Sequence, residues 1–303
     1  MNILFITANR LGDAVISTGL LNALIARYPT ARVTVVCGPV AASLFEPCPH
    51  VERVIPLVKQ RHDRHWLALW RACIGTRWDL AVDLRGSGVS LFLRAKRRRI
   101  LRGGRRPGRR LGHIAGLFGI APWPLPVTWS TAEQRRRAVA LLPAGSRYLA
   151  LAPTANWDGK IWPPERFAAL AQDLTREGFV PVLFYGPGED ERRRAGRVIA
   201  LLPMAHDLGG GRPVGEVAAL LGRCALFVGN DSGLMHLAAA SGIPTLGLFG
   251  PSKPSEYAPS GRCAAFVQTS GAEGEGAMED ISVAEVRDAA LALLACQVSA
   301  GGG

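Results

Sequence analysis

The stretch that decides the fold is residues 225–254, ALFVGNDSGLMHLAAASGIPTLGLFGPSKP. Residues 225–228 are an apolar run of strand length, and the cluster of turn-forming residues GNDSG follows it. Apolar residues then recur at helical spacing from Leu234 until Gly242, a residue that favours a helix end. Residues 243–249 form a second apolar run, so the pattern predicts a strand, a helix and a further strand.

The turn before this helix is predicted to bind an anion. The first N–H groups of a helix lack partners inside the helix and lie at the positive end of its dipole, which suits a phosphate. Gly229 and Gly233 let a ligand approach the backbone, and Asp231 or Ser232 is expected to cap the helix. An ordinary βαβ corner with a capped helix is the alternative interpretation of the same residues.

The length of the chain and a cluster of prolines predict two domains. The chain has 303 residues, of which 48% are hydrophobic, so two domains of roughly 150 residues each can bury cores. Three prolines at 122–126, PWPLP, interrupt any helix or inner strand. We expect an N-terminal domain at 1–130, a C-terminal domain at 131–303, and a last helix at 283–295 that could fold back onto the first domain.

Strand and helix patterns alternate in both halves, which predicts an α/β fold of two Rossmann-like domains with mainly parallel sheets. Ligands of such sheets gather at the carboxyl ends of the strands, so we expect a ligand in a cleft between the two domains. The expected strands are 2–7, 32–37, 54–58, 80–84, 100–101, 148–151 and 180–185, besides the two in the opening stretch. The expected helices are 14–28, 65–74, 132–142, 164–176, 191–201 and 214–221.

Several classes of protein are disfavoured. No apolar run reaches the roughly 18 residues of a membrane span, and the first residues, MNILFITANR, read as a strand rather than a signal peptide. We therefore expect a cytoplasmic protein. The six cysteines form no CxxC pair and the six histidines show no ligand spacing, so no metal is expected. A G-x-G-x-x-G after the first strand and a G-x-S-x-G elbow are both absent, which disfavours nicotinamide chemistry and hydrolases of that type.

The net charge of +12 is concentrated in residues 95–110, AKRRRILRGGRRPGRR. Such a run attracts polyanions: nucleic acid, anionic lipid headgroups or phosphorylated sugars. It also fits a solvated, mobile basic loop. Nucleic acid is disfavoured because no aromatic residues are interleaved with the charges and no reading motif is present.

Three loops carry the residues on which a reaction could depend. Asp13 follows the first strand and could be a general base or only cap the next helix. Lys160 follows Gly159, but Thr154 and Ile161 exclude a Walker A motif, so it could stabilise a leaving phosphate as a point charge or be a surface lysine. The third loop is the GNDSG turn.

Two further side chains could contact the ligand, and each also has a simple structural explanation. His236 lies one turn into the predicted helix and is either structural or directed at the ligand. Glu189 follows a strand end, where it could accept ribose hydroxyls or be a solvated acid. A base in one domain and phosphate binders in the other fit group transfer from a nucleotide-activated donor.

Five segments together resemble glycosyltransferase family nine, the lipopolysaccharide heptosyltransferases, along nearly the whole chain. The segments are RLGD at 10–13, DLAVDLRG at 79–86, KIWP at 160–163, GNDSGLMH at 229–236 and FGP at 249–251. The resemblance implies a GT-B fold and the metal-independent, inverting transfer of heptose from ADP-heptose. It makes Asp13 the base, Lys160 the residue that stabilises the diphosphate, and the inner core of lipopolysaccharide the acceptor.

The same resemblance implies which residues bind the two substrates. The donor-binding set is Gly12, Thr154, Glu189, Asp231, Ser232, Gly233 and His236. The acceptor-binding set is Arg10, Arg85 and Arg94, with the rest of the 94–110 run suited to an anionic glycolipid on the cytoplasmic face of the inner membrane. A GT-B enzyme with another nucleotide sugar, such as an epimerase, and a non-catalytic polyanion-binding relative remain alternatives.

Overall fold

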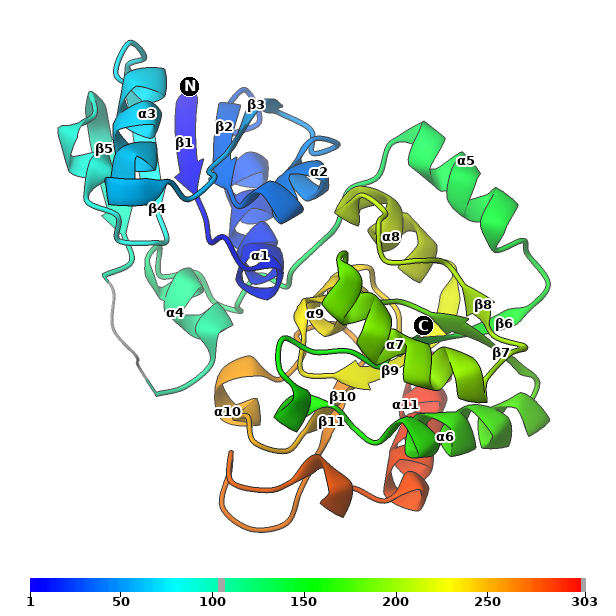
Figure 1. Cartoon of the computed structure of the whole chain (residues 1–303). Coiled ribbons are helices and arrows are strands. Elements are labelled where there is room, and N and C mark those ends of the chain that lie inside the picture. The colour runs from blue at the N-terminus through cyan, green and yellow to red at the C-terminus, as the bar shows by residue number, and fades with distance from the viewer. Residues whose placement is uncertain (103–106, 301–303) are drawn as a thin grey trace. The chain divides into compact units, whose positions relative to one another are not determined.

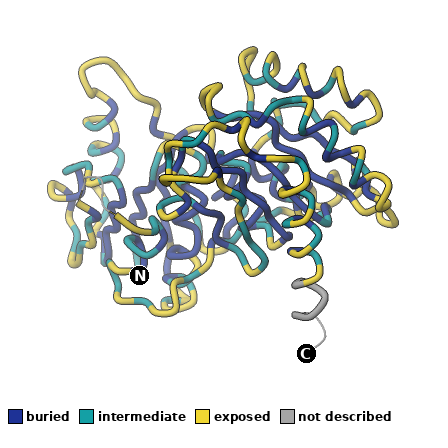
Figure 2. Tube along the Cα trace, turned by 90° about the horizontal axis from the view of Figure 1, so that it is seen from below, coloured by how far each residue is buried: buried dark blue, intermediate teal, exposed yellow. Residues whose placement is uncertain are grey.

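The computed structural model describes the backbone of residues 1–102 and 107–300 and the side chains as far as residue 295 (Figure 1). The chain divides into two compact units, Met1–Ser130 and Thr131–Gly303. Each unit is an α/β sandwich around one parallel sheet. The inner strands of both sheets are buried, whereas exposed residues concentrate in loops, on the outer sides of helices and on the edge strands (Figure 2).

The N-terminal unit has a five-stranded parallel sheet in the order β3-β2-β1-β4-β5. Helices of the crossover connections cover it, as the alternating apolar patterns predicted. The strands are β1 (Asn2–Ile6), β2 (Arg32–Cys37), β3 (Val51–Pro56), β4 (Trp78–Asp83) and β5 (Ala95–Ile100). The α-helices are α1 (Leu11–Arg27), α2 (Ala42–Phe45), α3 (Arg64–Cys73) and α4 (Arg110–Gly116).

The first helix begins earlier than the sequence indicated. The N–H of Ala14 donates to the carbonyl of Arg10 at 3.1 Å, which closes a helical turn over Gly12 and Asp13. These two residues therefore lie in the first turn of α1 rather than in a loop. Asp13 is not the cap, since the N-cap position belongs to Arg10, whose side chain makes no capping bond.

The basic run is also more ordered than a mobile loop. Its first part is the whole of β5, which pairs with β4 along its length and forms the edge of the sheet. Side chains of Lys96, Arg97 and Arg99 are exposed there, and charges on an edge strand discourage pairing with another chain. The part of the run at 103–106 lies outside the described residues.

The C-terminal unit has a six-stranded parallel sheet in the order β11-β10-β9-β6-β7-β8. Two of its strands, β8 and β11, were not predicted. The strands are β6 (Arg147–Ala152), β7 (Phe179–Leu183), β8 (His206–Asp207), β9 (Cys224–Asn230), β10 (Thr245–Phe249) and β11 (Ala264–Gln268). The α-helices are α5 (Ala132–Leu141), α6 (Pro164–Arg176), α7 (Glu189–Leu201), α8 (Val214–Leu221), α9 (Gly233–Ala240), α10 (Pro254–Tyr257) and α11 (Val283–Ala300).

The main core of this unit lies between the sheet and three of its helices. Trp162, Phe167 and Phe179 are almost completely buried in it, together with leucines of β6, β9 and β10. The last helix, α11, packs against α6, β9, β10 and β11, so it belongs to the core of the C-terminal unit.

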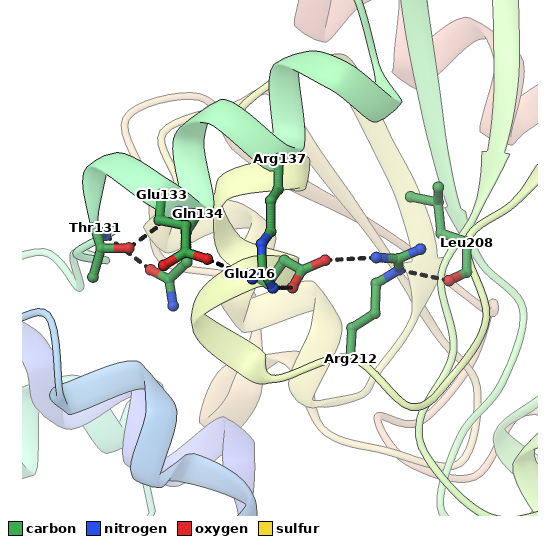
Figure 3. Close-up of polar contacts among 7 residues, drawn as sticks. All are labelled: Thr131, Glu133, Gln134, Arg137, Leu208, Arg212 and Glu216. Carbon is green, nitrogen blue, oxygen red and sulfur yellow. Dashed lines mark hydrogen bonds and ion pairs between the residues drawn. The ribbon is translucent and has the colours of Figure 1, made fainter.

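Two helices of the C-terminal unit are joined by a buried carboxylate (Figure 3). Thr131 and Gln134 form a capping box at the start of α5. Glu216 of α8 accepts a hydrogen bond of 2.5 Å from Nη1 of Arg212, and its second oxygen lies 3.7 Å from Nη1 of Arg137 on α5. The Glu216 side chain is only 8% exposed, so this contact holds α5 against α8 from inside.

Each sheet changes its direction of winding between two central strands, and this locates the ligand sites. In the N-terminal unit the change falls between β1 and β4, and in the C-terminal unit between β6 and β9. Helices on the two sides of such a point diverge, which leaves a crevice at the carboxyl ends of the strands. The loops after these four strands are therefore where functional side chains are expected, unit by unit.

Candidate active site

The N-terminal unit has a basic pocket of about 310 Å³ at the carboxyl ends of β1, β4 and β5. Four arginines line it, from four separate segments, and none of the lining residues is a carboxylate. The lining residues are Ala8, Asn9, Arg10, Leu84, Arg85, Leu101, Arg102 and Arg110. A concave site with four guanidinium groups suits a ligand that carries several carboxylates or phosphates.

Asp13 stands beside this pocket, in contact with one of its arginines. Its Oδ1 atom lies 3.6 Å from Nε of Arg110, and both side chains are about three-quarters buried. Arg110 also donates from Nη2 to the carbonyl of Leu84 at 3.4 Å, while its buried Nε makes no hydrogen bond. A carboxylate in the first turn of a helix and beside a cation is held in place, as a general base must be.

The loop after β4 holds Arg85 at the pocket. The fully buried carboxylate of Asp83 accepts bonds from the N–H of Arg85 at 3.0 Å and from the hydroxyls of Ser87 and Ser90. Arg85 donates to Oδ1 of Asn9 at 2.8 Å and lies over the ring of Trp66. Burial lowers the pKa of Arg85, but a guanidinium remains charged at any physiological pH.

The structure does not bring Arg94 to this pocket. Arg94 is exposed and immediately precedes β5, and its carbonyl accepts from the N–H of Trp78 at the start of β4. It therefore lies at the amino ends of the strands, whereas Arg10 and Arg85 lie at the carboxyl ends. The three arginines predicted to bind the acceptor are therefore divided between the two ends of the strands.

In the C-terminal unit the side chain of Lys160 reaches Asp231. Its Nζ lies 2.5 Å from Oδ2 of Asp231, and the two side chains are 20% and 8% exposed. Lys160 comes from the loop after β6 and Asp231 from the end of β9, the two strands at which the sheet reverses its winding. The two residues, 71 positions apart, are therefore parts of one site, with Asp231 fixing the position of the ammonium group.

Buried groups tie the Lys160 loop to the sheet. The N–H of Trp162 donates to Oδ1 of Asn230 at 3.0 Å, and the indole Nε1 donates to the carbonyl of Ile281 at 2.9 Å. On the other side of the loop, Arg194 donates to Asp158 at 2.7 Å and to the carbonyl of Ala155. The loop is thus held on both sides of Lys160.

The amino end of α9 offers polar groups without partners. Ser232 is the N-cap residue, but its hydroxyl makes no capping bond, and Asp231 is occupied by Lys160. The expected side-chain cap is therefore not formed. Among the described side chains, five buried polar atoms lack a hydrogen-bond partner. Three of them lie at the carboxyl ends of β9 and β10: Nδ2 of Asn230, the last residue of β9, and the hydroxyls of Ser232 and Ser252 in the segments that follow the two strands. A fourth is Nε of Arg110.

Such atoms concentrate where a ligand would supply the missing hydrogen bonds, because a buried unpaired polar group is costly. Gly233 is the first residue of α9, so its N–H is among those that the helix leaves unpaired. The combination of free N–H groups, a hydroxyl and Lys160 can bind a diphosphate and stabilise the charge that it gains on leaving.

The remaining predicted donor residues have different positions. Thr154 is buried just after β6, and His236 is buried in the first turns of α9. Glu189 is not in a loop: it is the exposed first residue of α7. The carboxylate that folds back onto the end of β7 is Glu191, which accepts from the N–H of Gly186 at 3.0 Å.

Sequence reasoning missed several residues of these sites. Arg102 and Arg110 were part of the basic run but were not singled out, and Asn9 and Ser252 were not proposed. The available signals were weak: Asn9 adjoins the predicted RLGD segment, and Ser252 follows the FGP segment. Within the described part of the chain, no three His, Cys, Asp or Glu side chains come close enough to hold one metal ion. No described helix is long and apolar enough to cross a membrane.

Two Rossmann-like units, each built on a parallel sheet, one with a carboxylate beside a basic pocket and one with unpaired polar groups at a helix amino end, define an α/β protein of the GT-B class. The model of glycosyltransferase family 9 (heptosyltransferase) matches residues 121–277, which is slightly more than half of the chain. The chain belongs to this family, and it is a glycosyltransferase.

Relatives with named roles align with this chain over most of its length. Lipopolysaccharide heptosyltransferase 2 of Salmonella typhimurium is 27% identical over 299 residues, which cover 84% of each chain. The structure of E. coli ADP-heptose lps heptosyltransferase II matches with a TM-score of 0.80 and 24% identity, over 98% of this chain and 100% of that chain. E. coli heptosyltransferase WaaC with ADP matches with a TM-score of 0.76 and 19% identity, over 95% and 98%. The two structures establish a common fold.

Proposed function

We propose that this enzyme transfers heptose from ADP-heptose to an anionic acceptor in the inner core of lipopolysaccharide, with inversion at the anomeric carbon and without a metal ion. The observation that carries the proposal is the pairing of Lys160 with Asp231 beside the unpaired amino end of α9. Relatives named as lipopolysaccharide heptosyltransferases support the choice of sugar and acceptor.

In the proposed reaction Asp13 removes the proton from the acceptor hydroxyl. The hydroxyl oxygen attacks the anomeric carbon of the heptose from the face opposite the diphosphate, and the bond between that carbon and the diphosphate breaks. A single displacement of this kind inverts the configuration and needs one base. Arg110, 3.6 Å from Asp13, holds the carboxylate in position in the proposed reaction.

The leaving group is ADP, whose terminal phosphate gains negative charge as the bond breaks. Lys160 and the first N–H groups of α9 stabilise this charge, and the hydroxyl of Ser232 donates a hydrogen bond to the phosphate. These are the roles that a divalent cation performs in many other transferases. Thr154 and His236 lie close in sequence to these groups and complete the proposed donor site. We propose Glu191, which folds back onto the end of β7, as the ribose contact in place of the exposed Glu189.

The acceptor is proposed to bind in the arginine pocket of the N-terminal unit. Inner-core lipopolysaccharide is rich in carboxylates and phosphates, and Arg10, Arg85, Arg102 and Arg110 present four cations to such a ligand. Since that acceptor is a glycolipid, we place the enzyme at the cytoplasmic face of the inner membrane.

The first experiment is calorimetric titration of the purified protein with ADP, UDP, GDP and CMP, and with their sugar derivatives, in the presence of EDTA. We expect ADP and ADP-heptose to bind at least tenfold more tightly than the others. A preference for UDP or CMP compounds would overturn the donor, and binding of ADP that requires added Mg²⁺ would overturn metal independence.

The second experiment replaces the base. Asp13→Asn should lower kcat by about 10²–10⁴-fold, the usual contribution of a general base, and leave the affinity for ADP-heptose unchanged. The exposed Asp63→Asn serves as a matched control and should keep full activity. Turnover by Asp13→Asn at the wild-type rate would refute the assignment of the base.

A further inference from the structure

Two adjacent apolar side chains, Leu91 and Phe92, are both exposed, and this pair is here called the apolar tip. Phe92 is 73% exposed, more than any other large apolar side chain of the described residues, and Leu91 is 59% exposed. They lie in a short 3-10 helix, Val89–Phe92, between β4 and β5. Single exposed apolar residues need no explanation, but two adjacent ones at a loop tip do.

The backbone of the apolar tip is fixed while its side chains are left outside. Arg98 of β5 donates to the carbonyls of Ser90 and Leu93, at 2.9 and 2.5 Å. The indole N–H of Trp70 donates to the carbonyl of Phe92 at 3.2 Å. Three hydrogen bonds from two side chains therefore hold the backbone of the apolar tip, so the exposure of Leu91 and Phe92 is a built feature rather than that of a frayed loop.

The ends of this segment are fixed as well. The hydroxyl of Ser90 donates to the buried carboxylate of Asp83 at 3.1 Å. Helix α3 lies against the segment and adds a further exposed leucine, Leu67, which is 48% exposed. An exposed leucine thus lies on the helix that packs against the segment of the apolar tip.

The sequence on both sides of the apolar tip is strongly basic. Between residues 59 and 102 the sequence has twelve Lys and Arg and only three Asp. Of these three, Asp83 is fully buried and Asp79 is paired with Lys96 at 2.7 Å. Arg94, which the acceptor pocket does not use, is exposed two positions after Phe92, and Arg71 is exposed on α3.

An exposed apolar pair among cations complements one kind of partner, the surface of an anionic bilayer. Aromatic and leucine side chains enter the boundary between headgroups and acyl chains, and basic side chains remain at the phosphates. We propose that Leu91 and Phe92, with Leu67, Arg71 and Arg94 around them, form the membrane-docking surface of this enzyme. The inference rests on the proposed function, because a lipid-anchored acceptor requires the enzyme to work at a bilayer.

The test is co-sedimentation of the full-length protein with vesicles of equimolar phosphatidylethanolamine and phosphatidylglycerol, compared with phosphatidylcholine vesicles. The wild type should bind the anionic vesicles and not the neutral ones. The double variant Leu91→Ser/Phe92→Ser should bind about tenfold more weakly, since two exposed side chains lose their transfer into the interface. Arg94→Gln should weaken binding less and reduce its dependence on salt.

Met204→Ser is the matched control, because Met204 is 63% exposed but belongs to the C-terminal unit. It should bind vesicles like the wild type. Unchanged vesicle binding by the double variant would overturn the proposal. So would a concentration-dependent dimer in sedimentation velocity that the double variant abolishes while vesicle binding persists, because the tip would then be a protein interface.

Activity on a delipidated, water-soluble acceptor separates this proposal from the proposed function. The double variant should keep the wild-type kcat and KM on that acceptor and lose activity only on acceptor embedded in vesicles. Equal losses on both acceptors would overturn docking as the role of the tip. Failure of the wild type itself to use the soluble heptose acceptor would instead refute the proposed function, whatever the vesicles show.

Discussion

The Nε atom of Arg110 lies 3.6 Å from Oδ1 of Asp13, and these residues are 97 positions apart in the chain. Asp13 lies in the first turn of α1, Arg110 is the first residue of α4, and the two helices pack together. Arg110 therefore touches both the proposed base and the basic pocket, so it can align one with the ligand of the other.

Replacing Arg110 with Gln should lower kcat by about 10–100-fold, because a charge-assisted contact contributes roughly 1.5–3 kcal/mol and each 1.4 kcal/mol is tenfold in rate. The dissociation constant of ADP should not change, since Arg110 lies in the other unit. Steady-state kinetics and calorimetry measure the two quantities. Arg110→Lys should recover part of kcat, and Arg97→Gln, which removes an exposed arginine of β5, should leave it unaltered. A wild-type kcat in Arg110→Gln would show that the contact between Arg110 and Asp13 does not contribute to catalysis.

Local patterns were sufficient for most elements and for the separate parts of the site. Helices α6 and α8 have the predicted bounds, because proline at or just before the first turn and an amphipathic spacing determine them locally. Asp13 and Lys160 lie near strand ends, although Asp13 is in the first turn of a helix rather than in the predicted loop. Their roles stay proposals that the kinetics above must test.

What the sequence could not show depends on contacts between distant segments. The pairs Asp13–Arg110 and Lys160–Asp231 exist because particular strands are neighbours in the sheets, and no local pattern encodes that order. Strand β5 was underestimated because a run of Lys and Arg has low strand propensity. It forms because β4 offers a full ladder of backbone partners and the side chains on an edge can reach water.

Lys160→Ala should reduce kcat by about 10²–10³-fold, the usual cost of removing one group that stabilises developing charge. Asp231→Asn should cost less, because the ammonium group remains but is no longer held. The two residues touch at 2.5 Å, so the double variant should be little worse than Lys160→Ala alone, and a double-mutant cycle measures this coupling. Strict additivity would contradict the pairing. Lys253→Ala removes an exposed lysine of the same unit and should have no effect.

Glu216→Gln should lower the free energy of unfolding of the C-terminal unit by about 1–3 kcal/mol, because two arginines lose a charged acceptor that is 8% exposed. Urea denaturation followed by circular dichroism measures it. Glu133 also pairs with Arg137, but both side chains are 60% exposed, so Glu133→Gln should change stability by no more than about 0.5 kcal/mol. Equal effects of the two substitutions would show that burial of Glu216 adds nothing.

Four buried thiols should make stability fall at alkaline pH. Burial raises the pKa of Cys37, Cys48 and Cys224 from 9.0 to about 12, and that of Cys73 to about 11. The folded protein keeps these thiols protonated where the unfolded chain has ionised them. Their contribution is therefore complete below pH 9 and is lost as the pH rises from 9 towards 11–12.

The same burial should protect these thiols from alkylation, because only the thiolate reacts. At pH 8 iodoacetamide should modify the native protein at Cys263 faster than at these four, as peptide mass spectrometry can show. Urea midpoints measured at pH 8 and pH 10 test the linkage, with Cys224→Ala as the partner variant. Its midpoint should fall less over this range than that of the wild type, since it lacks one thiol that ionises only on unfolding. Parallel falls in the two proteins, together with rapid alkylation of Cys224 in the native state, would show that this thiol is open to solvent.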